Sequence, residues 1–231
     1  MTDVAWRIYQ DGAQMTAAVA EDMRQRIQSA LDERGRALIA LPGGTTPAPI
    51  FERLALSIPS WQKVTILPTD DRLVFTESPL SNAAMIQRWF ASRGARVMPL
   101  ADANYDAETA GRLANARLQE LDWPPDVAWL GMGADGHTAS LFAGPDLANA
   151  LQTTDLAIGL RPDPLPPEAP VHRVTLSLSA LTSALSLMVV FSGAAKRAVL
   201  ERALAEGAKS TLPIGRVLAA APGPVTLHWS P

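Results

Sequence analysis

Residues 127–137, VAWLGMGADGH, join an apolar run to a glycine-rich turn that carries an acid, Asp135, and an imidazole, His137. The first four residues are typical of a buried strand. The three glycines that come next permit a tight turn with close approach of the backbone to a ligand. Thr138 and Ser140 suit the start of a helix, so a new helix is expected there. In open α/β folds ligands bind at the carboxyl ends of parallel strands, and this pattern predicts a site at such an edge.

Length and composition favour a single domain over residues 1–231. The chain is 48% apolar, which is ample for one sizeable core, and it contains no cysteine. The lack of cysteine excludes disulfides, thiolate metal sites and a cysteine nucleophile. The net charge of −3 disfavours a general nucleic-acid partner. No apolar run is long enough to span a membrane, and no signal peptide is visible at the start. We therefore expect a cytoplasmic, soluble monomer without a membrane partner.

Apolar runs and turn residues alternate along the chain. A helix is expected after Asp11, which with Gln14 forms a capping-box pattern. Further helices are expected from Pro47 and over 82–92, 106–121 and 194–205. Strands are expected at 4–9, 36–41, 64–67, 96–98, 127–130, 174–176, 187–191 and 225–229. This alternation predicts a three-layer α/β/α sandwich with a mostly parallel, Rossmann-like sheet. The proline-rich segment 161–170 fits a stiff loop within that domain.

Four chemically rich segments each come directly after an apolar strand, so they should gather along one edge of the sheet. They are residues 43–46, 69–72, 131–142 and 193–196. The first, Gly43-Gly44-Thr45-Thr46, suits a phosphate, because glycines let backbone N–H groups approach the oxygens at a helix N-terminus. It has neither the lysine of a nucleotide P-loop nor the Gly-x-Gly-x-x-Gly pattern of a dinucleotide site. A small phosphorylated ligand therefore fits better than ATP or NAD.

Three cations are candidate partners for such a ligand: Arg72, Arg173 and Lys196. Arg72 comes after two acids, so a salt-bridged surface arginine is the alternative. Arg173 precedes a strand, where an exposed charge at the sheet end is the ordinary expectation. Lys196 lies in the first turn of a helix, where the macrodipole favours an acid, and this indicates an anion nearby. A solvated lysine is the alternative there.

His137 is the candidate catalytic residue. A neutral histidine can take a proton from water and return it to a leaving oxygen. Asp135 would orient the imidazole or stabilise its protonated form. Metal binding is a competing use, but no second histidine stands at ligand spacing, and we expect neither metal nor cofactor. A serine hydrolase is disfavoured because Ser140 is not in a Gly-x-Ser-x-Gly elbow.

Together these residues resemble the 6-phosphogluconolactonase family. The matching segments run in family order: 41–47, 69–74 with 81–82, 131–142, 173–176, 193–196 and 212–213. The Asp-Gly-His-Thr-Ala-Ser-Leu-Phe run is the most specific of them. Asp71 stands where the family usually has Glu, Thr45 where serine is common and Ala143 where proline is common.

The resemblance implies metal-free hydrolysis of 6-phospho-D-glucono-1,5-lactone to 6-phosphogluconate, a step of the oxidative pentose phosphate pathway. His137 would be the base toward water, and Arg72 or backbone N–H groups would stabilise the oxyanion. Lys196, Arg173 and the 43–46 turn would hold the phosphate. The family motif places Asp71 and Asn82 among the binding residues. Which cation takes which role stays open at this stage.

Two alternatives have different chemistry. A related glucosamine-6-phosphate deaminase typically has an aromatic residue at the position of Arg72 and Phe-Asn-Glu beyond its histidine. Here His137 is followed by Thr-Ala-Ser-Leu-Phe. A non-catalytic sugar-phosphate sensor of similar fold usually carries a DNA-binding helix-turn-helix, and here the chain starts directly with the first strand and helix.

Overall fold

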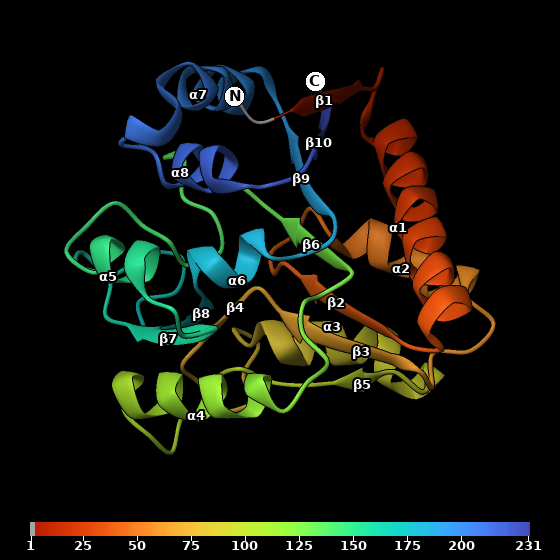
Figure 1. Ribbon diagram of the computed structural model, residues 1–231, viewed down its shortest axis with the longest axis horizontal. Helices are drawn as coiled ribbons and strands as arrows, with labels where there is room; N and C mark the ends of the chain where they lie inside the picture. Colours follow the sequence, from red (N-terminus) through yellow and green to blue (C-terminus); the bar gives the residue numbers. More distant parts are fainter. Residues whose placement is uncertain (1–2) are drawn as a thin grey trace.

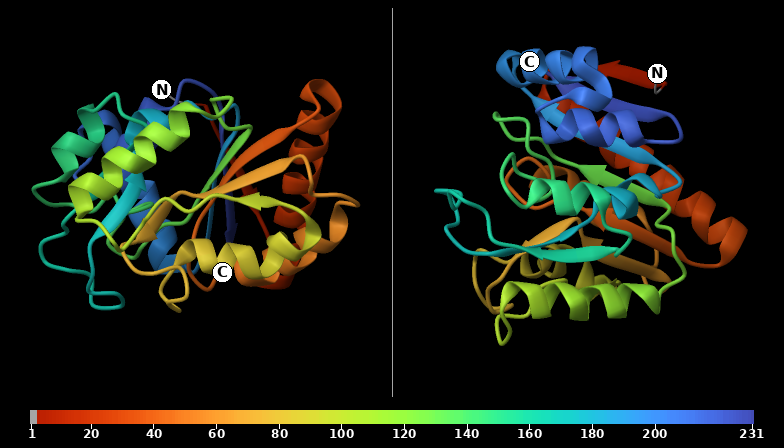
Figure 2. Two further views of the ribbon diagram at one scale, coloured as in Figure 1. Left: turned by 90° about the horizontal axis from the view of Figure 1, so that it is seen from below. Right: turned by 60° about the vertical axis from the view of Figure 1, so that its left-hand side comes forward.

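The computed structural model describes residues 3–231 and has a seven-stranded sheet at its centre (Figure 1). Its strand order is β1-β10-β9-β6-β2-β3-β5, and all neighbouring strands are parallel. The strands are β1 (Val4–Ile8), β2 (Ala37–Leu41), β3 (Val64–Pro68), β5 (Arg96–Val97), β6 (Val127–Leu130), β9 (Leu187–Ser192) and β10 (Val225–Ser230). Strand β1 pairs with β10, so the first and the last strand lie side by side at one side of the sheet (Figure 2, right).

Helices cover both faces of this sheet, as predicted for a three-layer sandwich. One face packs against α1 (Gly12–Arg34), α2 (Ala48–Ser57) and α3 (Asn82–Phe90). The core on the other face includes residues of α4 (Ala107–Gln119), α5 (Leu147–Gln152), α6 (Leu178–Thr182), α7 (Ala194–Glu206) and α8 (Pro213–Ala220). Helices α1 and α5 lie on opposite sides in Figure 1. Short 3-10 turns occupy Ala91–Arg93 and Gly207–Lys209.

The side chains of β6 show why both faces need cover. Val127 and Trp129 belong to the core under α1 and α2, whereas Ala128 and Leu130 belong to the opposite core. Successive side chains of a strand point to opposite faces, so a strand with helices on both sides is apolar throughout. None of the helices among the described residues is long and apolar enough to cross a membrane.

A second, antiparallel sheet of three strands was not predicted. Its order is β4 (Asp70–Arg72), β8 (Arg173–Leu176) and β7 (Ala157–Leu160). The strand expected at 174–176 therefore exists, but it lies in this sheet and not in the parallel one. One residue, Thr69, separates β3 from β4, so the chain passes directly from the large sheet to the small one. The proline-rich segment 161–170 connects β7 to β8.

Helix α4 packs on β7 at very short range. A Cβ atom placed on Gly159 would lie 1.6 Å from the Ala107 carbonyl oxygen, and one on Gly111 would lie 2.1 Å from the Gly159 nitrogen. The two backbones thus meet at a pair of glycines, where no side chain fits.

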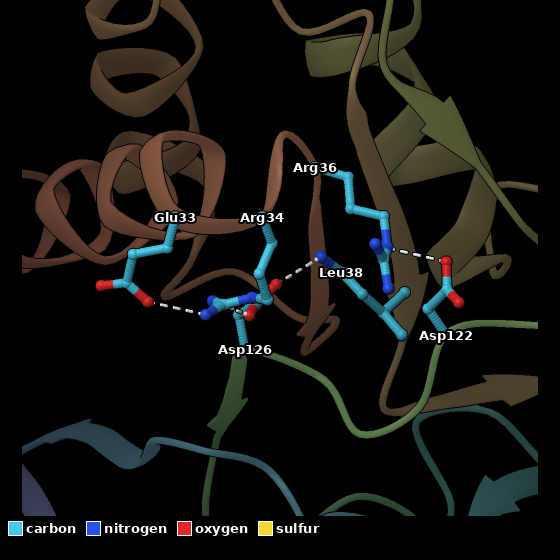
Figure 3. Close-up of polar contacts among 6 residues, drawn as sticks. All are labelled: Glu33, Arg34, Arg36, Leu38, Asp122 and Asp126. Atoms are coloured by element: carbon cyan, nitrogen blue, oxygen red, sulfur yellow. Dashed lines mark hydrogen bonds and ion pairs between the residues drawn. The ribbon is translucent and has the colours of Figure 1, made fainter.

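Asp126 joins the amino-terminal ends of β2 and β6 (Figure 3). Its Oδ2 accepts a hydrogen bond from the Leu38 backbone N–H at 2.7 Å, and its Oδ1 accepts one from the Arg34 guanidinium at 2.5 Å. Arg36 and Asp122 form an exposed ion pair beside them at 2.7 Å. Polar contacts therefore stabilise the amino-terminal ends of these strands. The chemically rich segments lie at the opposite, carboxyl-terminal ends.

Candidate active site

The four chemically rich segments meet in one cleft of about 270 Å³ at the carboxyl ends of the strands. The predicted convergence of the imidazole, the cations and the glycine turn is thus present in the structure. The sequence-predicted residues that line the cleft are Gly43, Gly44, Thr45, Thr46, Arg72, Asn82, His137, Arg173 and Lys196. The lining does not include Asp135 or Asp71.

His137 and Asp135 form a close pair. The His137 Nδ1 lies 2.6 Å from Asp135 Oδ1, which also accepts the His137 backbone N–H at 3.2 Å. The ring packs against Phe142 at a centroid distance of 4.6 Å. Partial burial opposes ionisation of the Asp135 carboxyl, but the His137 side chain and backbone N–H outweigh it and lower the pKa of that carboxyl. An ionised Asp135 fixes Nδ1 as the protonated nitrogen, which leaves Nε2 as the basic one.

Gly133 makes room for this pair. A Cβ atom at Gly133 would lie 2.2 Å from both Nδ1 and Cε1 of the His137 ring and 2.5 Å from Asp135 Oδ1. The turn closes on itself through a bond from the Gly133 N–H to the His137 carbonyl at 2.9 Å. Gly136 takes a φ of 80°, which favours glycine. Each of these two glycines therefore has its own geometric reason.

The helix expected immediately after His137 is not formed, and that prediction was wrong. The Thr138 hydroxyl donates to the Gly131 carbonyl at 2.8 Å, so it does not cap a helix. Ala139 adopts a left-handed conformation with a φ of 48°, and the Ser140 hydroxyl donates to Asp70 Oδ2 at 2.5 Å. These side-chain bonds compete with helix capping, and the next helix begins only at Leu147.

Arg72 and Arg173 line the cleft and bring positive charge to it without a close ion pair. Among the described residues, no carboxylate oxygen lies within 4 Å of either guanidinium. Arg72 Nη1 donates to the Leu80 carbonyl at 2.9 Å, and Arg173 Nη2 donates to the Ala169 carbonyl at 2.7 Å. Arg173 is only 1% exposed and also donates to the carbonyl of Val171. It is therefore a buried cation, not the exposed charge that its position before a strand suggested.

Burial lowers the pKa of the Arg173 guanidinium from its ordinary value, and the nearby Arg72 charge adds to that lowering. The negative charges of Asp70, Glu168 and Asp71 oppose it but do not outweigh it. Arginine nevertheless stays protonated in proteins, so the cleft keeps both charges. The desolvation of an unpaired cation costs free energy unless an anion compensates it. The pair thus favours an anionic ligand.

The 43–46 turn and Lys196 lie at the starts of α2 and α7, and neither helix has a side-chain N-cap bond. Gly44 takes a φ of 96°. A Cβ atom on Gly43 would lie 1.9 Å from Asn82 Oδ1, and Asn82 Nδ2 in turn donates to the Asp70 carbonyl at 2.8 Å. Asn82 therefore packs against the glycine turn and ties it to β4.

Asp71 lies behind the cleft, so the structure does not support its predicted contact with a ligand. The side chain is 2% exposed and its carboxylate accepts the backbone N–H groups of Asn82 at 2.6 Å, Arg72 at 2.9 Å and Ala83 at 3.1 Å. Burial raises the pKa of the Asp71 carboxyl to about 6 although those three bonds oppose the rise. Its contacts fasten the first turn of α3.

The cleft lining also includes residues that were not predicted to contact a ligand, among them Asp70, Trp129 and Glu168. Asp70 and Asp71 are adjacent in β4, and successive side chains of a strand point to opposite faces. Recognising the strand would have shown that only one of the two aspartates faces the cleft. The Trp129 indole Nε1 is buried, and among the described residues no hydrogen-bond acceptor reaches it. Glu168 comes from the proline-rich segment, whose position the sequence did not indicate.

A larger cavity of about 490 Å³ adjoins the cleft. His137, Ser140, Phe142 and Glu168 line both. The rest of its wall is mostly apolar and includes proline-rich residues 162–167. The segment between β7 and β8 is thus a neighbour of the His137 turn.

Fold and cleft together define an α/β protein whose histidine and cations share a site at the carboxyl edge of a parallel sheet. The chain belongs to the glucosamine-6-phosphate isomerase/6-phosphogluconolactonase family, whose sequence model matches residues 10–229. It is 36% identical to a curated 6-phosphogluconolactonase of Mesorhizobium japonicum, over 98% of this chain and 95% of the relative. The corresponding protein of Pseudomonas aeruginosa is 34% identical over 99% of this chain and 95% of its own length. The crystal structure of a 6-phosphogluconolactonase from Shewanella baltica has a TM-score of 0.91 and 29% identity, and the match covers 99% of this chain and 98% of that one.

Proposed function

We propose that this chain hydrolyses 6-phospho-D-glucono-1,5-lactone to 6-phospho-D-gluconate in the oxidative pentose phosphate pathway. The observation that carries the proposal is the shared cleft, in which His137 lies together with Arg72, Arg173 and Lys196. The names of the curated relatives favour the lactonase activity within the family over the isomerase activity. The sequence Thr-Ala-Ser-Leu-Phe after His137 favours it as well.

His137 acts as the general base in the proposed reaction. Its Nδ1 is engaged by Asp135, so Nε2 takes a proton from water as the water oxygen attacks the lactone carbonyl carbon. The tetrahedral intermediate then collapses, the bond from the carbonyl carbon to the ring oxygen breaks, and the imidazolium returns the proton to that oxygen. The products are the open-chain hydroxyl and the carboxylic acid, which ionises in water.

The cations divide between the two ends of the substrate. A phosphate at Arg173, Lys196 and the 43–46 turn meets backbone N–H groups, hydroxyls and two positive charges. Arg72 stands opposite Arg173 in the strand register and serves the phosphate or the carbonyl oxygen that becomes negative in the transition state. Fixing the phosphate far from the reacting carbon orients the carbonyl toward His137.

The test is an assay on freshly made lactone, generated by glucose-6-phosphate dehydrogenase and followed by its disappearance. The chain should accelerate the loss of lactone well above the spontaneous rate. The same rate is expected after EDTA treatment, because the proposed base and donors are all protein groups. A rate equal to the uncatalysed background would overturn the proposal, and activity restored by an added metal would overturn its metal-free form.

A further inference from the structure

Asp70 is a carboxylate of the cleft that the reaction above does not use. It is the first residue of β4, is 8% exposed, and lines the cleft beside Arg72 and His137. Its Oδ2 accepts the Ser140 hydroxyl at 2.5 Å. The only contact of Oδ1 with a described donor is the Thr69 hydroxyl at 3.4 Å, which is long for an O–H···O bond. One oxygen of a nearly buried carboxylate is therefore available as an acceptor.

Asp70 also has no close ion pair, although its charge interacts with that of Arg173 at longer range. Within the described part of the chain, no lysine, arginine or histidine nitrogen lies within 4 Å of its carboxylate. A buried carboxylate without an ion pair costs free energy unless hydrogen-bond donors satisfy it. The protein supplies one close donor, Ser140, and Asp70 is one of the residues that line the cleft.

The charge of Asp70 restricts which part of a ligand lies against it. A carboxylate repels a phosphate, so it does not belong with the phosphate-binding groups. It is a good acceptor for a neutral hydroxyl, and such a charge-assisted bond is among the stronger hydrogen bonds. The sugar lactone carries ring hydroxyls between its phosphate end and its carbonyl end.

We infer that Asp70 is a specificity-determining residue, which accepts a hydrogen bond from one ring hydroxyl of the sugar lactone. The inference rests on the proposed function and adds a named contact to it. Ser140 lies three residues beyond His137 and is 0% exposed, so its bond to Asp70 links the carboxylate to the turn that carries the base. The hydroxyl that binds Asp70 is thereby held at a fixed place relative to His137.

The experiment combines a protein substitution with substrate substitutions. Asp70→Asn keeps the shape of the side chain and removes its charge, and the 2-, 3- and 4-deoxy lactones each remove one ring hydroxyl. On the parent lactone, D70N should lower kcat/KM by about 10- to 100-fold, the range for a hydrogen bond to a charged group. On the deoxy lactone that lacks the contacted hydroxyl, the kcat/KM of wild type should fall by a similar factor relative to the parent lactone. The kcat/KM of D70N should fall little between the same two substrates. Such non-additivity measures the contact itself.

Ser140→Ala is the matched variant, because it removes the anchor of the carboxylate but keeps the charge. It should lose less activity than D70N and should still discriminate against the same deoxy lactone. If D70N loses the same factor on the parent and on all three deoxy lactones, Asp70 has only a structural role and the inference is wrong. Asp70→Ala takes the place of D70N in the cycle if D70N does not fold.

Calorimetric binding of 6-phosphogluconate and its deoxy analogues separates this inference from the proposed function. If wild type fails to hydrolyse the lactone, the proposed function fails, yet the binding cycle still reports on Asp70. A loss of affinity of about 10- to 100-fold in D70N that vanishes for one deoxy product supports the contact. Equal losses for every product overturn it, whatever the outcome of the activity assay.

Discussion

Arg72 and Arg173 lie directly opposite each other across the antiparallel strands β4 and β8. Like charges in that position destabilise a strand pair. The described residues offer neither guanidinium a carboxylate within 4 Å, and Arg173 is nearly inaccessible to water. The small sheet therefore holds two cations without a close ion pair, and Arg173 feels the charges of Asp70, Glu168 and Asp71 only from a distance. An anionic substrate would stabilise this arrangement.

Removing one of the cleft cations should weaken the binding of phosphorylated ligands. Arg72→Met and Lys196→Met should each raise KM for 6-phosphogluconolactone by roughly 10- to 100-fold, the range for a charge-assisted hydrogen bond. Unphosphorylated gluconolactone is the control. A loss of the same size on that substrate would contradict a phosphate role and, for Arg72, would instead favour contact with the carbonyl oxygen.

Replacing His137 should remove the chemistry and leave the binding. His137→Ala should lower kcat by roughly 10²- to 10⁴-fold, because general acid–base catalysis is lost. The affinity for 6-phosphogluconate should change little, since the cations and the glycine turn remain. Asp135→Asn should lower kcat less, because Nε2 is still present but Nδ1 loses its charged partner. Turnover of His137→Ala at the wild-type rate would exclude His137 as the base.

A methyl group at Gly133 should displace the His137–Asp135 pair. Gly133→Ala places its Cβ 2.2 Å from the His137 ring, so kcat should fall by at least about 10-fold through misplacement of the base. Gly12→Ala is the matched control, because no heavy atom lies within 4 Å of a Cβ there. Circular dichroism should show both variants folded. Full activity of Gly133→Ala would mean that the turn adjusts without cost to the reaction.

Asp71 should give the folding free energy a pH dependence at acid pH. Its pKa of about 6 lies above the ordinary 3.8, so the folded state binds this proton more tightly than the unfolded state. The stabilising contribution is complete below about pH 4 and is lost as the pH rises through about 6. Two pKa units correspond to on the order of 2–3 kcal/mol.

Urea unfolding of wild type and Asp71→Asn at several pH values between about 4 and about 7 measures this contribution. Wild-type stability should fall relative to the variant as the pH rises across that window. Parallel curves for the two proteins would show that Asp71 is not the group responsible. Any pH-independent loss of unfolding free energy that the variant suffers from weaker contacts with α3 does not change the slope of stability against pH. The comparison of the two slopes therefore isolates the titration of Asp71.

The large sheet could be predicted because its strands are apolar runs. The position of the site could be predicted because the turn residues come directly after those runs. Residues 127–130 are buried on both faces, and the chain turns at Gly131 and Gly133. The small sheet was missed because β4 consists of Asp70, Asp71 and Arg72, which carry no apolar pattern. The pairing of β4 with β8, not the local sequence, makes those residues a strand.

The turn after His137 was predicted wrongly for a similar reason. Thr138 and Ser140 are good helix-capping residues, but here their hydroxyls bond Gly131 and Asp70. Such partners are remote or depend on the fold, so local propensity could not reveal them. The burial of Arg173 results likewise from the carbonyls of 169–172 folding around it.

Only Thr69 connects β3 to β4, so the start of β4 is fixed by the end of β3. This fixes which of Asp70 and Asp71 points toward the cleft. Lengthening or shortening residues 69–72 by one position would exchange the two carboxylates, because strand side chains alternate strictly. Asp71, which holds the first turn of α3, would then face the cleft, and Asp70 would face the helix. An insertion or deletion in this connection should consequently disturb both the start of α3 and the cleft. A substitution of Asp71 should affect mainly the helix, and one of Asp70 mainly the cleft.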